Sequence, residues 1–127
     1  MEGELQMSWN YSQSTGALTR NGAIVDVGYS GCDDGLNNPA DQAIPDEGPI
    51  PVGTYDISPA FTHPVCGPVS MRLDPQVGTD TLGRSGFLIH GDNQAMNHTA
   101  SHGCVILPKG TRMAIDGSDD RVLVVTA

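Results

Sequence analysis

Apolar and polar residues alternate in the first part of the chain with the period of two that is typical of a half-buried β-strand. Trp9 and Tyr11 lie on one face of the first such stretch, and the dipeptide Asn21-Gly22 is a strong signal for a two-residue hairpin turn. A later glycine-led run around Tyr55 has the same strand-like composition. The pattern predicts strands at residues 7–13, 17–20, 23–31 and 53–61.

The second half of the chain holds three short apolar runs without clear alternation. Residues 87–89 form a strand-like run that ends at His90, and residues 104–108 form another. The run 122–125 has four consecutive apolar residues, so we expect it to be buried on both faces of a sheet. Residues 109–118 are expected to hold one or two helical turns. About seven or eight short strands and little helix predict a mainly β fold, a β-sandwich or barrel-like sheet.

The length of 127 residues fits one domain with a hydrophobic core of its own. We therefore treat residues 1–127 as a single domain, in which residues 1–7 are expected to be disordered or left over from a cloning vector. The 16 glycines and 9 prolines favour many turns. The stretch 31–49 is acidic and has no periodicity, so we expect a solvated loop that borders the functional cleft and favours cationic amines.

The formal net charge is −9, from 15 acidic and 6 basic residues. Phosphate groups repel such a chain, which argues against binding to nucleic acid and against adhesion to anionic lipids. No apolar run approaches the ~20 residues that span a bilayer, so no membrane insertion is expected. The N-terminal stretch lacks the basic and apolar regions of a secretory signal. We therefore expect synthesis in the cytoplasm without a signal peptide.

The three cysteines are Cys32, Cys66 and Cys104, and an odd number leaves at least one thiol unpaired in a monomer. Whether Cys32 and Cys66 pair stays open, because a reduced cytosolic protein would keep all three as thiols. Cys104 lies in the stretch 86–108, which also contains three of the four histidines. Its residue type leaves four roles open: nucleophile, metal ligand, half of a disulfide, or buried thiol.

A Cys–His pair for acyl transfer is one interpretation of this stretch. His90 ends an apolar strand upstream of Cys104, and a loop that folds back would bring imidazole and thiol together at adjacent strand ends. Gly103 has no β-carbon, so the backbone there can bend sharply and approach a substrate. The backbone N–H groups of Gly103 and Cys104 could then face a developing oxyanion.

Two simpler interpretations compete with this pair. Most free cysteines are small buried core residues, and composition alone does not exclude that role for Cys104. A zinc site would draw on His90, His98, His102 and Cys104. It is disfavoured because His98 and His102 would need a helix to share a face, and the sequence around them is a poor helix former. No metal is therefore expected.

The stretch around Cys104 resembles the active-site signature of the L,D-transpeptidase family, the YkuD-like cysteine enzymes of peptidoglycan. Their signature is a histidine followed by glycine, a spacer, and then Ser/Thr-His-Gly-Cys, and this chain matches it at His90-Gly91 and Ser101-His102-Gly103-Cys104. Typical members carry an arginine where this chain has Ile106. The segments at 48–57 and 83–92 resemble short type VI secretion effectors of this family, in which that arginine is commonly aliphatic.

The resemblance implies that Cys104 attacks the L,D-amide between meso-diaminopimelate, the third stem residue, and the D-amino acid at the fourth position. A thioester acyl-enzyme would form, with His90 as the base. Water would give carboxypeptidase activity, whereas a free D-amino acid or a neighbouring stem amine would give exchange or cross-linking. The residues expected to shape the loop are Ser101, His102 and Gly103, and those expected on the substrate side are Arg84, Gly91 and Asp92.

Arg84 is our candidate for a carboxylate contact, because arginine binds carboxylates in a bidentate manner; a surface charge beside a turn is the alternative. Asp92 would orient His90 or cap a turn. The resemblance further implies an antibacterial toxin that acts in a target cell's periplasm on peptidoglycan stem peptides and D-amino acids, without a cofactor, and that a cognate immunity protein restrains. Two other classes stay open: a non-catalytic module that binds peptidoglycan or a partner, and a housekeeping cell-wall L,D-transpeptidase.

Overall fold

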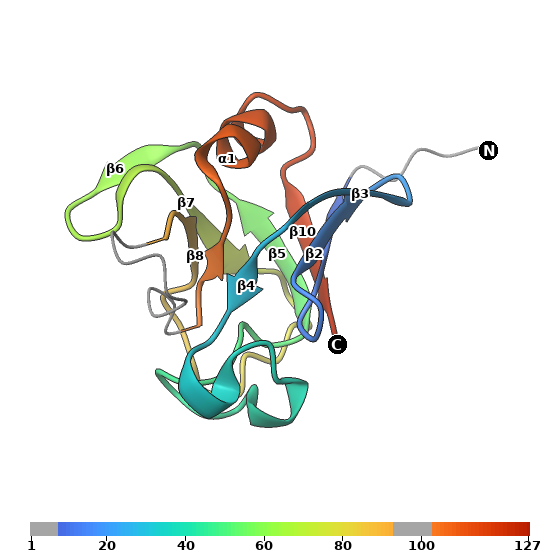
Figure 1. Ribbon diagram of the computed structural model, residues 1–127, viewed down its shortest axis with the longest axis vertical. Helices are drawn as coiled ribbons and strands as arrows, with labels where there is room; N and C mark the ends of the chain where they lie inside the picture. Colours follow the sequence, from blue (N-terminus) through green and yellow to red (C-terminus); the bar gives the residue numbers. More distant parts are fainter. Residues whose placement is uncertain (1–7, 93–102) are drawn as a thin grey trace.

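The computed structural model describes residues 8–92 and 103–127, which form one strongly curved sheet with a short helix beside it (Figure 1). Within these residues ten strands follow the order β3-β2-β1-β10-β5-β7-β8-β9-β4, with β6 paired to β7 beside this path. The strands are β1 (Trp9–Ser12), β2 (Ala17–Arg20), β3 (Ala23–Val27), β4 (Tyr29–Ser30), β5 (Gly53–Ile57), β6 (Phe61–His63), β7 (Gly67–Pro75), β8 (Leu88–His90), β9 (Val105–Ile106) and β10 (Val122–Thr126). The helices are η1 (Asp33–Gly35), η2 (Pro39–Asp41) and α1 (Lys109–Asp116).

The order of the strands explains why the sheet nearly closes into a barrel. β1 pairs in parallel with the last strand, β10, and β10 pairs antiparallel with β5. The two edge strands, β3 and β4, are consecutive in the chain and are joined at Gly28. A single residue therefore connects the two edge strands, so that the sheet curves around its core and nearly closes.

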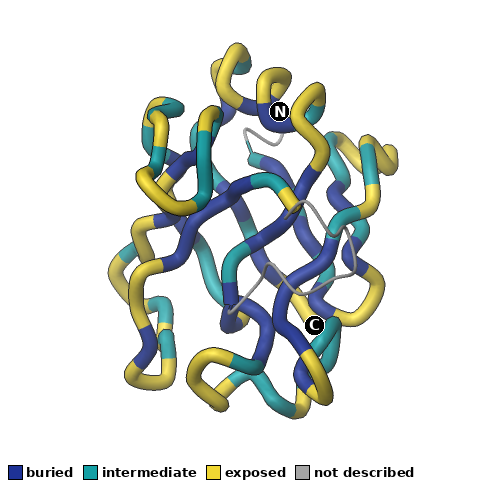
Figure 2. Tube along the Cα trace, turned by 60° about the vertical axis from the view of Figure 1, so that its left-hand side comes forward, coloured by how far each residue is buried: buried dark blue, intermediate teal, exposed yellow. Residues whose placement is uncertain are grey.

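Alternate residues of the strands supply the hydrophobic core, as the period of two requires. Figure 2 shows the buried stretches running along the central strands, with the exposed stretches in the connecting loops. Burial of each large apolar side chain contributes about 1.5–3 kcal/mol. The core cluster consists of Trp9, Tyr11, Leu18, Ile50, Tyr55, Ile57, Met71, Leu73, Phe87, Ile89, Val105, Leu107, Ile115, Leu123 and Val125.

The mainly β class predicted from the sequence is confirmed, with differences in individual strands. The run 23–31 is two strands rather than one, because the chain breaks at Gly28 and β3 and β4 lie at opposite ends of the strand order. The run 122–125 was expected to be buried on both faces, but only Leu123 and Val125 are buried. One face of β10 is therefore partly open to solvent.

β7, the longest of the described strands, was not predicted from the sequence. Met71 and Leu73 are buried and alternate with exposed residues, so the period-two signal is present. Prolines at both ends hide it, and Val69 has a positive φ of 56° that interrupts the regular strand. This strand carries β8 on one side, so its position decides where the candidate site forms.

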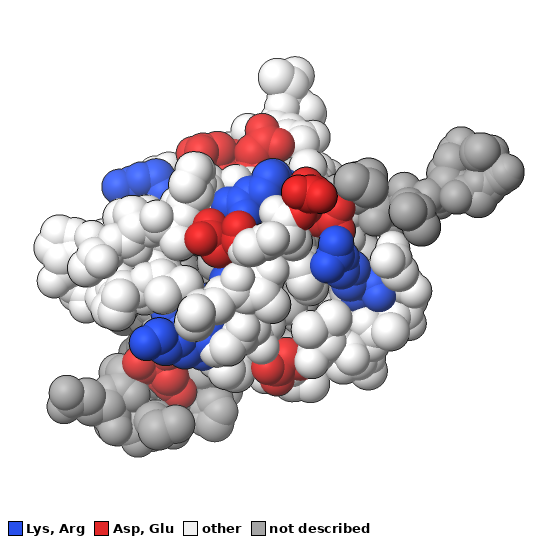
Figure 3. Space-filling view, turned by 90° about the horizontal axis from the view of Figure 1, so that it is seen from above, with Lys and Arg blue, Asp and Glu red and all other residues white. Residues whose placement is uncertain are grey.

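The helical and acidic segments lie at the margins of the sheet. Residues 109–118 contain one helix, α1, which begins after Pro108 and buries Arg112 and Ile115. The stretch 31–49 holds η1 and η2. On the face shown in Figure 3, acidic and basic side chains lie close to one another instead of in separate patches. In the described part of the chain, no helix has the length and apolar character to span a membrane.

Candidate active site

β8 and β9 bring His90 and Cys104 to one face of the sheet. The strands pair in parallel with His90 opposite Ile106, and two steps back along this register Leu88 lies beside Cys104. In a parallel pair, the last residue of one strand and the first residue of the other lie at opposite ends of the pair. Because β8 and β9 have only three and two residues, His90 and Cys104 are nevertheless offset by only a small distance along the strands. His90 therefore lies one strand over and two residues along from Cys104, a diagonal at which long side chains meet across a sheet.

The opposite face of the same strands belongs to the core. Ile89, Val105 and Leu107 are fully buried in the core cluster. Because side chains alternate along a strand, anchoring these residues inside directs His90 and Cys104 to the other face. The sequence prediction that the two strands are neighbours is confirmed, and the core residues supply the physical reason for the orientation.

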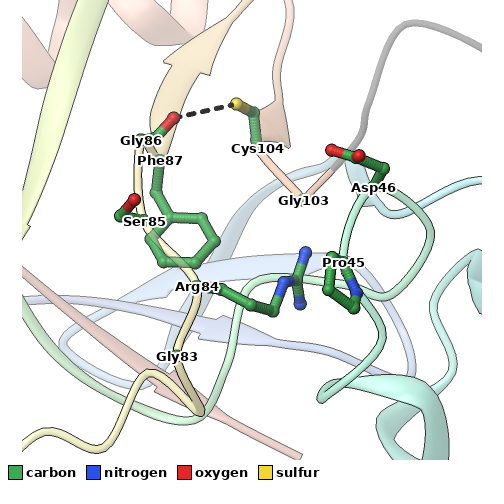
Figure 4. A pocket seen from close by; sticks show the side chains of 9 residues that line it. All are labelled: Pro45, Asp46, Gly83, Arg84, Ser85, Gly86, Phe87, Gly103 and Cys104. Atoms are coloured by element: carbon green, nitrogen blue, oxygen red, sulfur yellow. Dashed lines mark hydrogen bonds between the residues drawn. The ribbon is translucent and has the colours of Figure 1, made fainter.

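The thiol of Cys104 lies at the edge of a cavity of about 230 Å³. Its Sγ is 4.0 Å from the carbonyl oxygen of Gly86 (Figure 4). Burial raises the pKa of the thiol to about 11, although the Leu88 backbone hydrogen bond and the Arg84 charge act in the opposite direction. At neutral pH the sulfur is therefore protonated, and a base must remove its proton before or during attack.

His90 is 4 % exposed and its ring is oriented by the main chain. Its Nδ1 lies 2.8 Å from the carbonyl oxygen of Gly91. A carbonyl oxygen can only accept, so Nδ1 carries the hydrogen and Nε2 keeps its lone pair. Burial lowers the pKa of His90, and the charge of Arg112 and the imidazole of His63 lower it further, against the Gly91 bond and Asp92. The imidazole is thus a neutral base at pH 7.

The cavity next to the thiol has walls from three parts of the chain. Figure 4 shows Pro45 and Asp46 of the acidic stretch on one side and residues 83–87 on the other, with the Gly103-Cys104 segment between them. The expectation that the stretch 31–49 borders the cleft matches this arrangement. Asp46 has a positive φ of 62°, which is rare for a residue other than glycine and holds this loop in a fixed shape.

Arg84 is buried under the cavity and holds the acidic stretch in place. Its Nη1 donates to the carbonyl oxygens of Gln42 at 2.6 Å and Pro49 at 2.7 Å, and its Nη2 donates to that of Gly48 at 3.0 Å. The guanidinium carbon lies 5.5 Å from the centre of the Phe87 ring. Arg84 therefore uses much of its hydrogen-bonding capacity on carbonyl groups of the acidic stretch. Because it is buried, Arg84 is not a surface charge beside a turn.

Each glycine next to the Cys–His pair packs against a buried arginine. A β-carbon on Gly103 would collide with Nη2 of Arg84, and the φ of Gly103 is +121°, which other residues rarely adopt. A β-carbon on Gly91 would lie 2.7 Å from Nη2 of Arg112. These contacts give a physical reason for the glycines of the His-Gly and Gly-Cys pairs in the sequence.

Arg112 is the site residue that sequence reasoning missed. It comes from α1, whereas Ile106, at the position of the usual family arginine, is 3 % exposed and pairs with Tyr29 of β4. One available signal was the spacing of three between Arg112 and Ile115, which places both on one helix face. Its contact with Gly91 joins residues far apart in the chain, which a local motif does not reveal.

Asp92 follows His90 and is linked to the edge strand β4. The hydroxyl of Tyr29 donates a hydrogen bond to Oδ1 of Asp92 at 2.6 Å. On the thiol side, Ser30 of β4 is fully buried, and its Oγ lies 3.4 Å from the carbonyl oxygen of Gly103. Adjacent residues of β4 thus contact the segments that carry the imidazole and the thiol.

Ser101, His102 and His98 lie outside the described residues. The zinc alternative depends on two of them, and within 8–92 and 103–127 no three His, Cys, Asp or Glu residues are grouped to hold a metal. Cys32, Cys66 and Cys104 form no disulfide with one another. Cys32 is buried, and its Sγ donates to the carbonyl oxygen of Asp46 at 3.4 Å.

The described residues provide the parts for nucleophilic chemistry on a carbonyl compound. A protonated thiol, a neutral imidazole with an oriented free nitrogen, and a small cavity that borders the thiol suit acyl transfer. The chain segments that hold these groups are short strands anchored on the core.

Comparison with known proteins adds two findings. A family model described as the Tlde1 domain matches residues 25–125. Among solved structures, the chain is similar to the helical cell shape determining protein Pgp2 from Campylobacter jejuni, with a TM-score of 0.59 and 16% identity over 93% of this chain. This chain covers 46% of that protein chain, and at this identity the likeness concerns the fold. The comparison with curated protein sequences gave no match.

Proposed function

Because the chain belongs to the Tlde1 domain family of type VI secretion L,D-transpeptidase effectors, we propose that it is a peptidoglycan-modifying cysteine enzyme. Its substrate is a stem tetrapeptide, and its activity is that of an L,D-carboxypeptidase or L,D-transpeptidase. The observation that carries the proposal is the β8–β9 pairing, which sets His90 diagonal to Cys104 on one face of the sheet. Arg112 and Arg84 support the two sides of this pair.

In the first half of the reaction, Sγ of Cys104 attacks the amide carbonyl carbon of the third stem residue. Nε2 of His90 accepts the thiol proton as the S–C bond forms, because the raised thiol pKa leaves little thiolate at neutral pH. The backbone N–H groups of Gly103 and Cys104 are candidates to stabilise the oxyanion. Collapse of the tetrahedral intermediate breaks the C–N bond, and His90 returns the proton to the leaving D-amino acid.

In the second half, the thioester is passed to an acceptor. Water, a free D-amino acid or a stem amine attacks the carbonyl carbon while His90 accepts the acceptor's proton, and the thiol is restored as the S–C bond breaks. Asp46 on the cavity wall places a carboxylate near the path of a cationic amine. The side of Arg84 that lines the cavity is the candidate contact for a substrate carboxylate.

The test is a product assay with defined muropeptides. Purified protein is incubated with diaminopimelate-containing disaccharide tetrapeptide, with and without a D-amino acid, and products are separated by mass spectrometry. Wild type is expected to release the terminal D-amino acid or to exchange it, and Cys104→Ala to do neither. A non-catalytic binding module predicts no product from either protein, and that result would reject the enzyme.

The toxin role is tested separately in living cells. The chain is expressed in a bacterium with diaminopimelate-type peptidoglycan, once with an added periplasmic signal and once without it. Growth inhibition is expected only for the exported wild type and not for exported Cys104→Ala. Equal harmlessness in both compartments, with product formation in the assay above, would point to a housekeeping cell-wall enzyme.

A further inference from the structure

Arg112 is a buried cation that takes no part in the proton and acyl transfers proposed above. It projects from α1, is 8 % exposed, and its Nε donates to the carbonyl oxygen of Leu107 at 3.0 Å. Its Nη1 donates to the carbonyl oxygens of Pro68 at 2.9 Å and Val69 at 3.1 Å. All three acceptors are neutral, and the described residues offer Arg112 no ion pair.

Burial of such a charge is costly for a fold that needs only packing at this position. Taking an ion out of water costs several kcal/mol, and neutral carbonyl groups offset this less well than a carboxylate does. An apolar side chain on α1 would pack against the sheet without that cost, as Ile115 does one turn later. The position of the guanidinium therefore calls for a reason beyond stability.

The guanidinium lies against the peptide that orients His90. A β-carbon built on Gly91 would be 2.7 Å from Nη2 and 3.1 Å from Cζ of Arg112, so this glycine rests on the planar group. The carbonyl oxygen of the same Gly91 accepts the hydrogen bond from Nδ1 of His90 at 2.8 Å. A movement of the Gly91 peptide would therefore move the imidazole.

We propose that Arg112 is a positioning residue for His90, which packs against Gly91 and so fixes the peptide that orients the imidazole. The proposal rests on the proposed function, in which His90 is the base. Arg112 also connects α1 to the irregular start of β7, where Val69 has a positive φ. The helix and the strand therefore both support the position of Arg112 next to Gly91.

The surroundings of His90 set the expected electrostatic effect. Arg112 from α1 and His63 from β6 lower the pKa of His90, while Asp92 after β8 raises it. Loss of the Arg112 charge removes one of the lowering influences, so the pKa of His90 should rise. Since the reaction needs the neutral imidazole, the acid limb of the pH–activity profile should move to higher pH.

The experiment compares Arg112→Gln with Arg121→Gln. Arg121 serves as the control because it also donates to main-chain carbonyl oxygens, of Ile115, Asp116 and Ser58, but does not shift the pKa of His90; unlike Arg112 it also pairs with Asp116. The readouts are the NMR titration of the His90 ring and kcat/KM against pH. Arg112→Gln is expected to raise the His90 pKa and to lower kcat by about 10- to 100-fold; Arg121→Gln should leave the titration unchanged.

Two further variants keep the test decisive if Arg112→Gln does not fold. Arg112→Lys keeps the charge but lacks the planar guanidinium group, so it should lower kcat and leave the acid limb of the pH–activity profile unchanged. Gly91→Ala pushes a β-carbon into the guanidinium and should lower kcat while Arg112 remains. An unchanged His90 titration in Arg112→Gln, or full activity in Arg112→Lys and Gly91→Ala, would overturn the proposal. If wild type forms no product, the proposed function fails, but the NMR titration still tests the link between Arg112 and His90.

Discussion

The guanidinium of Arg84 occupies the space that a β-carbon on Gly103 would need, directly before the residue that carries the thiol. Arg84 cannot easily withdraw, because its two terminal nitrogens donate to three carbonyl oxygens of the acidic stretch, those of Gln42, Gly48 and Pro49. The position of Cys104 is therefore linked through one glycine and one arginine to the opposite wall of the cavity.

The variant Gly103→Ala tests this relationship. The new β-carbon meets Arg84, and the φ of +121° is strained for alanine, so we expect a loss of about 1–3 kcal/mol in the free energy of unfolding. Activity should fall by about 100-fold, because the thiol is displaced. Chemical denaturation and the muropeptide assay measure the two effects. Gly110→Ala is the control: its β-carbon meets nothing within 4 Å, and stability should stay the same or rise.

The reactivity of the Cys104 thiol should rise with pH, as expected for a thiol that burial keeps protonated at neutral pH. Its pKa of about 11 leaves a thiolate fraction of only about 10⁻³ at pH 8, so alkylation by iodoacetamide should be slow at neutral pH and rise steadily up to pH 10. Peptide mapping separates Cys104 from Cys32 and Cys66. Rapid alkylation of Cys104 that levels off below pH 8 would instead indicate a preformed thiolate–imidazolium pair.

The ionisation of His90 should set the acid limit of activity. Its pKa is lowered by burial, so more than half of the base is neutral at pH 6.5, where half of an ordinary histidine population is protonated. Activity should therefore persist below pH 6.5 and fall only as the pH passes the lowered pKa of the folded state. A kcat/KM profile with its acid midpoint above pH 7 would disagree with this environment.

Replacement of the base should remove turnover without unfolding the protein. His90→Ala is expected to lower kcat by about 10²- to 10⁴-fold, the usual contribution of general base catalysis. The control is His98→Ala, for which the sequence predicts no effect on either folding or turnover. Equal activities for His90→Ala and wild type, measured on the tetrapeptide at pH 7, would assign the proton transfer to another group.

Restoration of the usual family arginine at position 106 should damage the protein. Ile106 is buried between β8 and β4, where an arginine would take a charge out of water and would not fit the space of the isoleucine. Ile106→Arg should cost about 3–5 kcal/mol, because removing a charge from water costs several kcal/mol. Ile106→Val should cost only about 0.5–1.5 kcal/mol. Thermal unfolding decides this, and a stable, more active Ile106→Arg would show that the position tolerates the charge.

Much of the fold and the central pair could be predicted because their signals are local. Apolar runs that end at His90 and begin after Cys104 mark two strand ends, and a parallel pairing then places both side chains on one face. β7 was missed because its prolines and the positive φ of Val69 obscure an otherwise regular alternation. The local sequence pattern does not indicate that the chain breaks at Gly28 into β3 and β4, which lie at opposite edges of the sheet. This break depends on the closure of the whole sheet.

The two buried arginines show why the rest of the site could not be predicted. Arg84 was expected to contact a substrate carboxylate, and its bonds to the 42–49 carbonyl oxygens depend on a loop path that the sequence does not specify. Arg112 meets Gly91 across 21 positions of the chain, and its one local signal, the spacing of three from Ile115, indicates a shared helix face but not a place in the site. Such contacts are defined by tertiary packing rather than by spacing.

Whether Cys104 is the nucleophile is tested most directly by intact-protein mass spectrometry after rapid acid quenching of the protein with its tetrapeptide substrate. We predict a covalent adduct of the tripeptide muropeptide on the wild-type chain, located at Cys104 by peptide mapping and absent from Cys104→Ala. Release of tripeptide by Cys104→Ala, or an adduct located at Cys32 or Cys66, would contradict it.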